Sequence, residues 1–242
     1  MRSHKPAVAL LMLATALPAL AGPKLTAEQV LDKHVAATGG RAAYERIKST
    51  VTKATAKLAA QGIGGPMEIY AKYPNKMLTV QTLSGIGETR QGYDGKVAWS
   101  KDPLQGLRKL SGPEAELVAR GAVFNTQLNW RKAFPKVALL ADKKIGAATC
   151  YVVKLAPEVG QPLLQYFDQK TFYMVRMDMT FEGPQGKMAI ETTIGDYRPV
   201  DGVKVPFSMR QKIGGAAEMV VTLTSVKNNV PIDDTMFAMP KK

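Results

Sequence analysis

The chain has 242 residues, 45% of them hydrophobic and 22% charged, which is enough apolar material for one large globular domain and excludes wholesale disorder. Its formal net charge is +13, from 33 Lys and Arg against 20 Asp and Glu. These positive charges are dispersed, with no basic helix or arginine-rich run, so nucleic acid is not an expected partner. A diffuse positive field suits an anionic membrane surface or an acidic envelope protein, and it equally suits solubility alone.

The first 21 residues have the pattern of a secretory signal peptide. A short positive region from Arg2 to Lys5 precedes an apolar stretch, and Ala19-Leu20-Ala21 forms the small-x-small pattern of a cleavage site. The apolar stretch is too short for a stable membrane span. We therefore expect cleavage before Gly22, a mature domain over residues 22–242 and a location in the periplasm.

A helix is expected to open the mature domain. Thr26 is a suitable N-cap, and Gln29 follows it at the spacing of a capping box. Apolar residues then recur with a helical period until Gly39-Gly40, where glycine suits the end of a helix. A second short helix is predicted from Ala42 to Ile47.

From residue 49 to residue 100, polar and apolar residues mostly alternate, as they do in strands with one buried face. Asp94-Gly95 predicts a tight hairpin turn inside this segment. The period becomes helical again after Ser111, where Pro113 suits the first turn of a helix. A further helix is predicted from Thr126 to Phe134.

From residue 149 to residue 224, the chain is predicted to be a succession of strands separated mostly by glycine-containing turns. A tail follows, in which Ile232 and Phe237 are expected to plug into the domain. Short strands at regular spacing indicate an antiparallel meander of about ten strands. Because a sheet of this length must curl to bury its apolar face, the helices can cover its concave side. We therefore expect a mainly β (α+β) fold with a single curled antiparallel sheet.

The reactive side chains do not form a recognisable catalytic constellation. His34, on the apolar side of the opening helix, is interpreted as a packed, hydrogen-bonded residue, and the single cysteine, Cys150, as a small packed side chain. Zinc-site spacings, nucleophile elbows and phosphate-binding loops are not found in the sequence. We expect no enzyme, no metal site and no cofactor; a hydrolase built from scattered carboxylates is the remaining enzymatic alternative.

Methionine is abundant, with 12 in the chain, and several methionines fall on the apolar faces of adjacent predicted strands. This flexible, polarizable side chain accepts apolar partners of different shapes, although the same residues could also fill a dense core. A curled sheet under few helices often leaves a hollow. From the alternation, the strand residues predicted to line a ligand-binding cavity are Met67, Ile69, Leu78, Val80, Tyr173, Val175, Met177, Met179, Met188, Ile190, Phe207, Met209, Met219 and Val221. Val118 and Phe124 are predicted to contribute from the central helices.

Several segments, spread over nearly all of the mature chain, carry a family resemblance. They are residues 34–40 (HVAATGG), 73–76 (YPNK), 93–99 (YDGKVAW), 166–168 with 171–173 (YFD, TFY), 196–207 (DYRPVDGVKVPF) and 229–234 with Phe237 (NVPIDD). The sequence is similar through these segments to the periplasmic lipoprotein-carrier (LolA/LolB-like) superfamily, in its outer-membrane lipoprotein-sorting branch. The motifs are mainly turn and strand-end residues, so they specify the fold better than the ligand.

The resemblance implies an incomplete half-barrel of about 10–11 antiparallel strands, with the helices as a lid over an apolar cavity. It also implies binding or carriage of a lipid, an acyl chain or a lipidated protein. We therefore expect a non-catalytic, monomeric periplasmic carrier that acts in outer-membrane biogenesis. The alternative is a non-enzymatic envelope interaction module whose core is filled and which binds a partner protein.

Overall fold

The computed structural model describes residues 25–183, 186–215 and 217–241, and the predicted signal peptide lies outside these ranges. Thirteen strands form one antiparallel sheet in the order β6-β5-β4-β3-β2-β1-β13-β12-β11-β10-β9-β8-β7. Every neighbouring pair is consecutive in the chain except β1 and β13, which join the two halves. The strands are β1 (Ser49–Leu58), β2 (Ile63–Lys72), β3 (Lys76–Leu83), β4 (Gly87–Tyr93), β5 (Ala98–Asp102), β6 (Gly106–Lys109), β7 (Lys136–Ile145), β8 (Ala148–Ala156), β9 (Leu163–Asp168), β10 (Met174–Gly183), β11 (Gly186–Val200), β12 (Val203–Ile213) and β13 (Ala217–Asn228). The predicted meander is confirmed.

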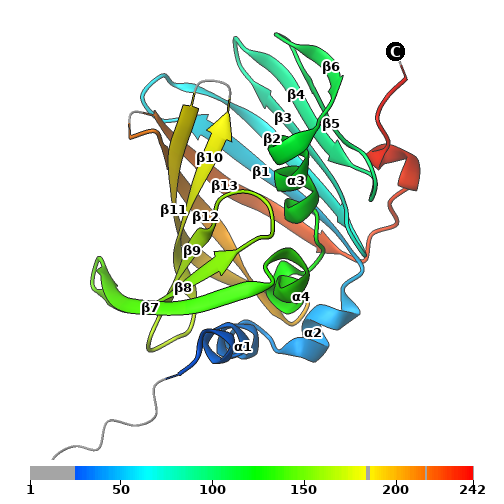
Figure 1. Ribbon diagram of the computed structural model, residues 1–242. Coiled ribbons are helices and arrows are strands. Elements are labelled where there is room, and N and C mark those ends of the chain that lie inside the picture. The colour runs from blue at the N-terminus through cyan, green and yellow to red at the C-terminus, as the bar shows by residue number, and fades with distance from the viewer. Residues whose placement is uncertain (1–24, 184–185, 216, 242) are drawn as a thin grey trace, which may run out of the picture.

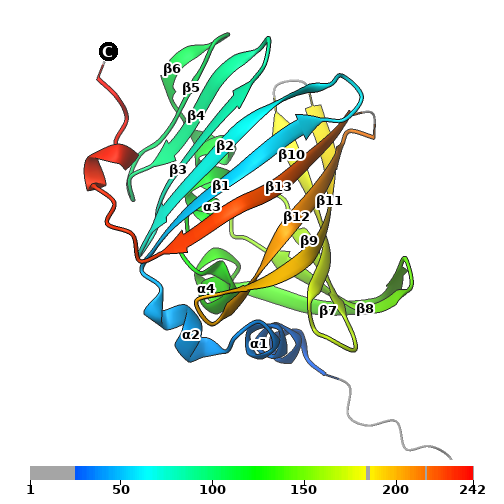
Figure 2. The same ribbon diagram turned by 180° about the vertical axis from the view of Figure 1, so that it is seen from behind.

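The helices are α1 (Ala27–Ala37), α2 (Arg41–Arg46), α3 (Gly112–Gly121) and α4 (Thr126–Ala133), and a 3₁₀ turn, η1 (Asp234–Phe237), lies in the C-terminal tail. The predicted capping box of α1 is present: the backbone N–H of Thr26 donates to the Gln29 side chain at 2.8 Å, and that of Gln29 to the Thr26 hydroxyl at 3.2 Å. In Figures 1 and 2 the sheet curls around α3 and α4, while α1 and α2 lie at one end of the curl. The sheet remains open between its edge strands β6 and β7.

The two faces of the sheet are distinguished by neighbouring residues of β5. Ala98 packs against Val118 of α3, so its face is called the inner face. Trp99 packs on the opposite, outer face beneath the tail, where its indole N–H donates to the Phe237 carbonyl at 2.8 Å. A Cβ on Gly92 of β4 would lie 2.3 Å from the indole, so only glycine allows this overlap. The predicted plugging of the tail is confirmed by the burial of Ile232 and Phe237.

One end of the inner face is densely filled by α1 and α4. This cluster, called the closed end, has as its large members Val30, Leu31, Trp130, Phe134, Val153, Leu155 and Phe167. The helices contribute apolar faces, and β8 and β9 contribute every second residue, as helical and strand periods require. Side chains such as Val30 and Phe167 are fully buried in this cluster, so they are not accessible to a ligand.

The edge strands β6 and β7 were not predicted from the sequence, which explains why thirteen strands are present where ten or eleven were expected. β7 is exposed along most of its length, and its pairing with β8 shifts between Leu140 and Lys143. Edge strands lack the regular burial that produces a two-residue period. The sequence pattern therefore underestimates the width of the sheet.

Candidate functional site

Most of the predicted cavity residues do lie together on the inner face. The register places Met67 beside Ala54, Met219 beside Leu58, Met209 beside Val221 and Met179 beside Ile190, all on one side of the sheet. The predicted residues on this face are Met67, Ile69, Met177, Met179, Met188, Ile190, Phe207, Met209, Met219 and Val221. Except for Phe207 and Val221, they keep part of their surface exposed. We call the region of these residues the open end.

Two predicted strand residues, Leu78 and Val80, lie on the outer face instead. They pack with Trp99 under the tail. The pairing of β2 with β3 places Thr79 beside the inward-facing Ile69, so the adjacent residues of β3, Leu78 and Val80, point outward. A one-residue error in register inverts every side chain of a strand. Threonine and glutamine residues of β3 therefore face inward, where the alternation of apolar residues indicated the opposite.

Val175 and Tyr173 were also predicted on the cavity wall, and a local irregularity displaces both. Val175 packs with Cys150 and Tyr166 on the outer face, at a bulge in the pairing of β10 with β9. Bulges put an additional residue into one strand and break its alternation. Tyr173 precedes β10, and its ring contacts that of Tyr197 in a tilted arrangement with centroids 4.6 Å apart. The Tyr173 hydroxyl accepts a hydrogen bond from Lys204.

The two predicted helix residues fill small cores. Val118 packs between α3 and β5 with Ala98 and Leu110, and Phe124 packs under α2 with Tyr44 and Val203. Both are almost fully buried. These contacts hold α3 and the start of α4 against the sheet. Leu117, next to Val118 in α3, faces the open end.

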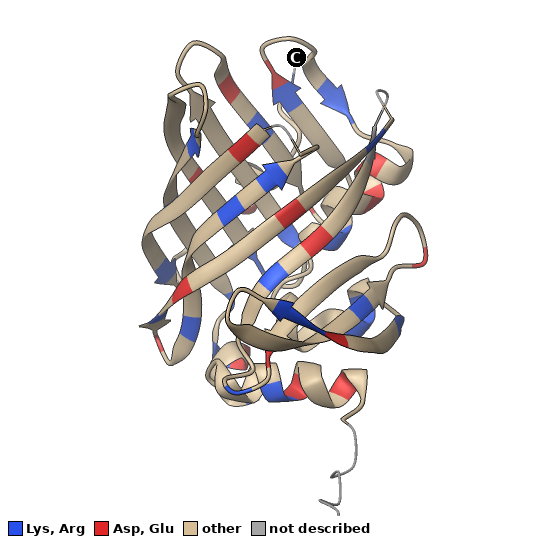
Figure 3. Cartoon of the chain, turned by 90° about the vertical axis from the view of Figure 1, so that its left-hand side faces the viewer, with Lys and Arg blue, Asp and Glu red and all other residues tan. Residues whose placement is uncertain are grey.

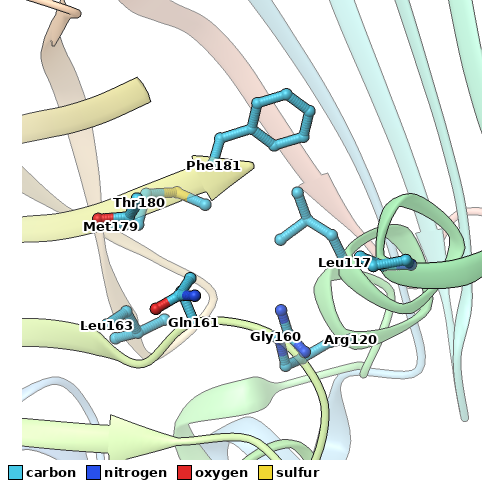
Figure 4. A pocket seen from close by; sticks show the side chains of 9 residues that line it. Leu117, Arg120, Gly160, Gln161, Leu163, Met179, Thr180 and Phe181 are labelled. Atoms are coloured by element: carbon cyan, nitrogen blue, oxygen red, sulfur yellow. The ribbon is translucent and has the colours of Figure 1, made fainter. Parts of the chain in front are cut away.

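A pocket of about 330 Å³ lies where α3 faces β10 and the segment between β8 and β9. It is lined by Pro113, Leu117, Arg120, Gly160, Gln161, Leu163, Met179, Thr180 and Phe181. In Figure 4 the side chains of Leu117, Met179 and Phe181 converge on this space. Its volume is at the small end of the usual range for ligand sites. Met179 is the one residue that the sequence prediction shares with this lining.

The sequence contained a signal for one of the lining residues that the prediction left out. Phe181 continues the alternation of Met177 and Met179 along β10. Leu117 precedes Val118 in α3, and a helical period alone does not decide which of two adjacent apolar residues faces the sheet. Leu163 follows the proline-containing segment before β9, and only the tertiary fold places it here.

Arg120 is the one charged residue that lines this pocket in the described part of the chain. One of its guanidinium nitrogens, Nη1, donates to the Val159 carbonyl at 3.0 Å, which connects α3 to the segment before β9. The guanidinium also lies 5.9 Å from the ring centroid of Phe134. Burial lowers the pKa of Arg120, and the nearby Glu116 carboxylate opposes this effect. A half-buried cation therefore lies at the rim of an apolar space.

Charges of both signs are spread over the strands seen in Figure 3. On the outer face of β10, Arg176 bonds Asp178 at 2.6 Å and Glu191 at 2.9 Å. The Tyr166 hydroxyl donates to Asp178 at 2.7 Å, and burial together with this carboxylate raises the pKa of Tyr166 to about 12. The charges of this group pair with one another, as expected from a sequence in which charges of both signs are dispersed.

His34 and Cys150 have packing roles. The Nδ1 atom of His34 lies 2.8 Å from the carbonyl oxygen of Phe172. The His34 ring is buried, and its centroid lies 5.1 Å from that of the Phe167 ring. Burial raises the pKa of the Cys150 thiol, which keeps it protonated. The described residues contain no group of three or more His, Cys, Asp or Glu side chains arranged to hold a metal ion. No helix in the described ranges is long and apolar enough to cross a membrane.

Comparison with known proteins identifies the architecture. No family model matches the sequence, and no curated protein matches it. A DUF1329-family protein from Desulfovibrio piger matches with a TM-score of 0.58 at 13% identity, over 88% of this chain and 97% of that one. A LolA superfamily protein from Nitrosomonas europaea matches with a TM-score of 0.59 at 15% identity, over 89% and 98%. The chain has a LolA-like fold.

The LolA-like fold has a third structural neighbour, an outer-membrane lipoprotein-sorting protein domain from Vibrio parahaemolyticus. That match has a TM-score of 0.56 at 11% identity, over 87% of this chain and 97% of that one. The three matches extend over nearly the whole length of each neighbour and over most of this chain, so one architecture accounts for most of the chain. The resemblance inferred from short motifs is confirmed at the level of the fold, with the helices on one side of an open curled sheet.

Proposed function

We propose that this LolA-like protein binds the acyl chain of a lipid or lipidated protein at the open end and carries it through the periplasm without catalysis. The observation that supports this most directly is the pocket between α3 and β10, which Leu117, Met179 and Phe181 line with apolar surface. Methionine side chains continue this surface along β10, β11, β12 and β13. Such a surface adapts to chains of different length and shape.

The energetics of the open end favour an amphiphile over a polar ligand. Transfer of each CH₂ group from water into an apolar site contributes about 0.8 kcal/mol, so even half of an acyl chain would offset the cost of immobilising the ligand. The partly exposed methionines would lose water contact when a chain covers them. A carrier must also release its cargo, and a pocket that is open to solvent on one side suits reversible binding.

Three further points belong to the same proposal. The predicted signal peptide would deliver the protein to the periplasm. The outer-membrane lipoprotein-sorting protein domain from Vibrio parahaemolyticus provides a functional analogy. His34 is buried and hydrogen-bonded, and Cys150 is held protonated, so neither side chain is placed to act as a catalytic base or nucleophile. This supports a non-enzymatic role. The lipidated cargo or the membrane that supplies it would then be the partner of a monomeric carrier.

Native mass spectrometry of the mature protein purified from periplasm tests this function, followed by extraction and identification of any bound lipid. A co-purifying phospholipid, fatty acid or lipidated peptide at fixed stoichiometry is the expected result. An apo mass, with no uptake after lipid is added, would instead favour the envelope interaction module. The filled closed end is the feature that would suit such a module, and pull-down of one partner protein would support it.

A further inference from the structure

Arg120 belongs to the walls of two adjacent pockets. On one side lies the apolar pocket of Leu117, Met179 and Phe181. On the other side lies a more polar pocket of about 420 Å³, between α3, α4 and the segment that follows β8. The Arg120 guanidinium is thus positioned where an apolar pocket meets a polar one. Figure 4 shows Arg120 among the residues that line the apolar pocket.

The second pocket has an excess of positive charge. Its charged residues are Arg120 and Glu116 from α3, Arg131 and Lys132 from α4, and Glu158 from the segment after β8. The three cations outnumber the two carboxylates. Lys132 and Arg131 are exposed, so the polar pocket remains accessible from solvent. An anion that entered there would meet a net positive field.

We propose that the two pockets together bind a single-chain anionic amphiphile, with its acyl chain against Leu117, Met179 and Phe181 and its carboxylate or phosphate on Arg120. This assignment rests on the proposed function, because it names the headgroup chemistry of the same site. A guanidinium presents five N–H donors in a planar fork that matches carboxylate and phosphate oxygens. In the described residues, one hydrogen bond from Arg120 is found, to the Val159 carbonyl, so donors remain for a ligand.

Burial supplies the energetic reason for an anion at this position. The charged form of Arg120 is disfavoured by its surroundings, and the Glu116 carboxylate compensates only in part. A ligand anion at hydrogen-bonding distance would restore the lost solvation with a charge-assisted bond. A neutral amphiphile of equal chain length would gain the same apolar contact but would leave the cation as it is.

The test is displacement of the neutral probe N-phenyl-1-naphthylamine from the full mature protein by hexadecanoic acid, hexadecyl phosphate or hexadecanol at pH 7.5. We expect both anionic ligands to displace the probe at roughly tenfold to hundredfold lower concentration than the alcohol, the range of one charge-assisted hydrogen bond. A preference for only the acid or only the phosphate identifies which headgroup the site takes.

The variants Arg120→Gln, Arg120→Lys and Arg90→Gln separate the role of the headgroup from structural effects. Arg120→Gln should abolish the preference for anions and leave hexadecanol binding unchanged, and Arg120→Lys should retain part of the preference. Arg90, which pairs with Glu88 on the outer face, is the matched control, and its variant should behave as wild type. Circular dichroism checks the fold of each variant.

The outcomes distinguish this inference from the proposed function. Equal displacement by acid, phosphate and alcohol in the wild type would overturn the headgroup assignment and leave acyl-chain binding intact. Equal loss of all three ligands in Arg120→Gln would show that Arg120 only holds α3 to the Val159 segment, and it would also overturn the assignment. Failure of the probe and of all three ligands to bind the wild type would refute both proposals.

Discussion

The inner face of the sheet is packed differently at its two ends. At the closed end, α1 and α4 cover β8 and β9, and Val30, Val153 and Phe167 have no exposed surface. At the open end, α3 faces β10 across a pocket, and methionines on β10 to β13 remain partly exposed. The same curled sheet therefore contains a densely packed core at one end and, around the smaller buried cluster that includes Phe207 and Val221, a partly exposed apolar surface at the other.

This difference shows how the LolA-like fold can combine a buried core with a partly exposed apolar surface. The closed end and the small cores under α2 and the tail consist of buried side chains that pack against one another. The open end can then retain apolar surface that a monomeric protein would otherwise bury. Substitutions at the two ends should accordingly affect different properties: stability at the closed end and ligand binding at the open end.

Phe167→Ala tests the closed end and should have the largest effect. Removal of a fully buried aromatic ring from a dense cluster should lower the free energy of unfolding by about 3–5 kcal/mol, as measured by urea denaturation. Met209→Ala at the open end is the comparison, with an expected loss of about 1 kcal/mol because its side chain is already partly exposed. Similar losses for both variants would contradict the division of the inner face.

Met179→Asp tests the open end. A carboxylate at the wall of the pocket would have to be desolvated against an acyl chain, so affinity for a fluorescent fatty acid should fall by at least about a hundredfold. The free energy of unfolding should change little. Ala189→Asp is the control, because Ala189 is exposed on the outer face of the adjacent β11. Unchanged affinity of Met179→Asp in a fluorescence titration would place the ligand elsewhere.

His34 should make the closed end sensitive to pH. Burial lowers the pKa of His34 in the folded state below its unfolded value of about 6.5. At pH values between these two pKa values, the unfolded chain binds more protons than the folded protein does. Stability should therefore decrease as the pH falls below about 6.5, by at most about 1.4 kcal/mol per pH unit. Urea unfolding at pH 7.5, 6.5 and 5.5 measures this slope. The slope should be smaller in His34→Gln, and an equal slope in that variant would assign the effect to other groups.

Thr192→Val should have the smallest effect and the opposite sign. The Thr192 hydroxyl is buried on the inner face of β11, and it has no hydrogen-bond partner in the described part of the structure. Its replacement by a methyl group should raise the free energy of unfolding by about 1 kcal/mol. Thr193→Val, on the exposed outer face of the same strand, should change it by less than about 0.5 kcal/mol. Destabilisation by Thr192→Val in thermal melting would indicate an ordered partner for the hydroxyl.

The sequence alone determined the elements whose signals are local. The capping box of Thr26 and Gln29, the alternation along β10 to β13 and the Asp94-Gly95 turn each depend on residues close together in the chain. Short motifs were also sufficient for the LolA-like resemblance, because turn residues are constrained by backbone geometry. The predicted inner-face positions on β2 and β10 to β13 follow from the same two-residue period, except where the bulge displaced Val175.

Only the tertiary structure decided which apolar residues meet across the inner face. The register of β2 against β3 turned Leu78 outward, and the packing of α3 turned Val118 toward the sheet and Leu117 toward the pocket. Contacts between segments distant in the chain, such as Arg120 with Val159, leave no periodic signal. The physical reason is that alternation specifies two faces for each strand, but pairing and helix docking decide which face is filled and which remains open.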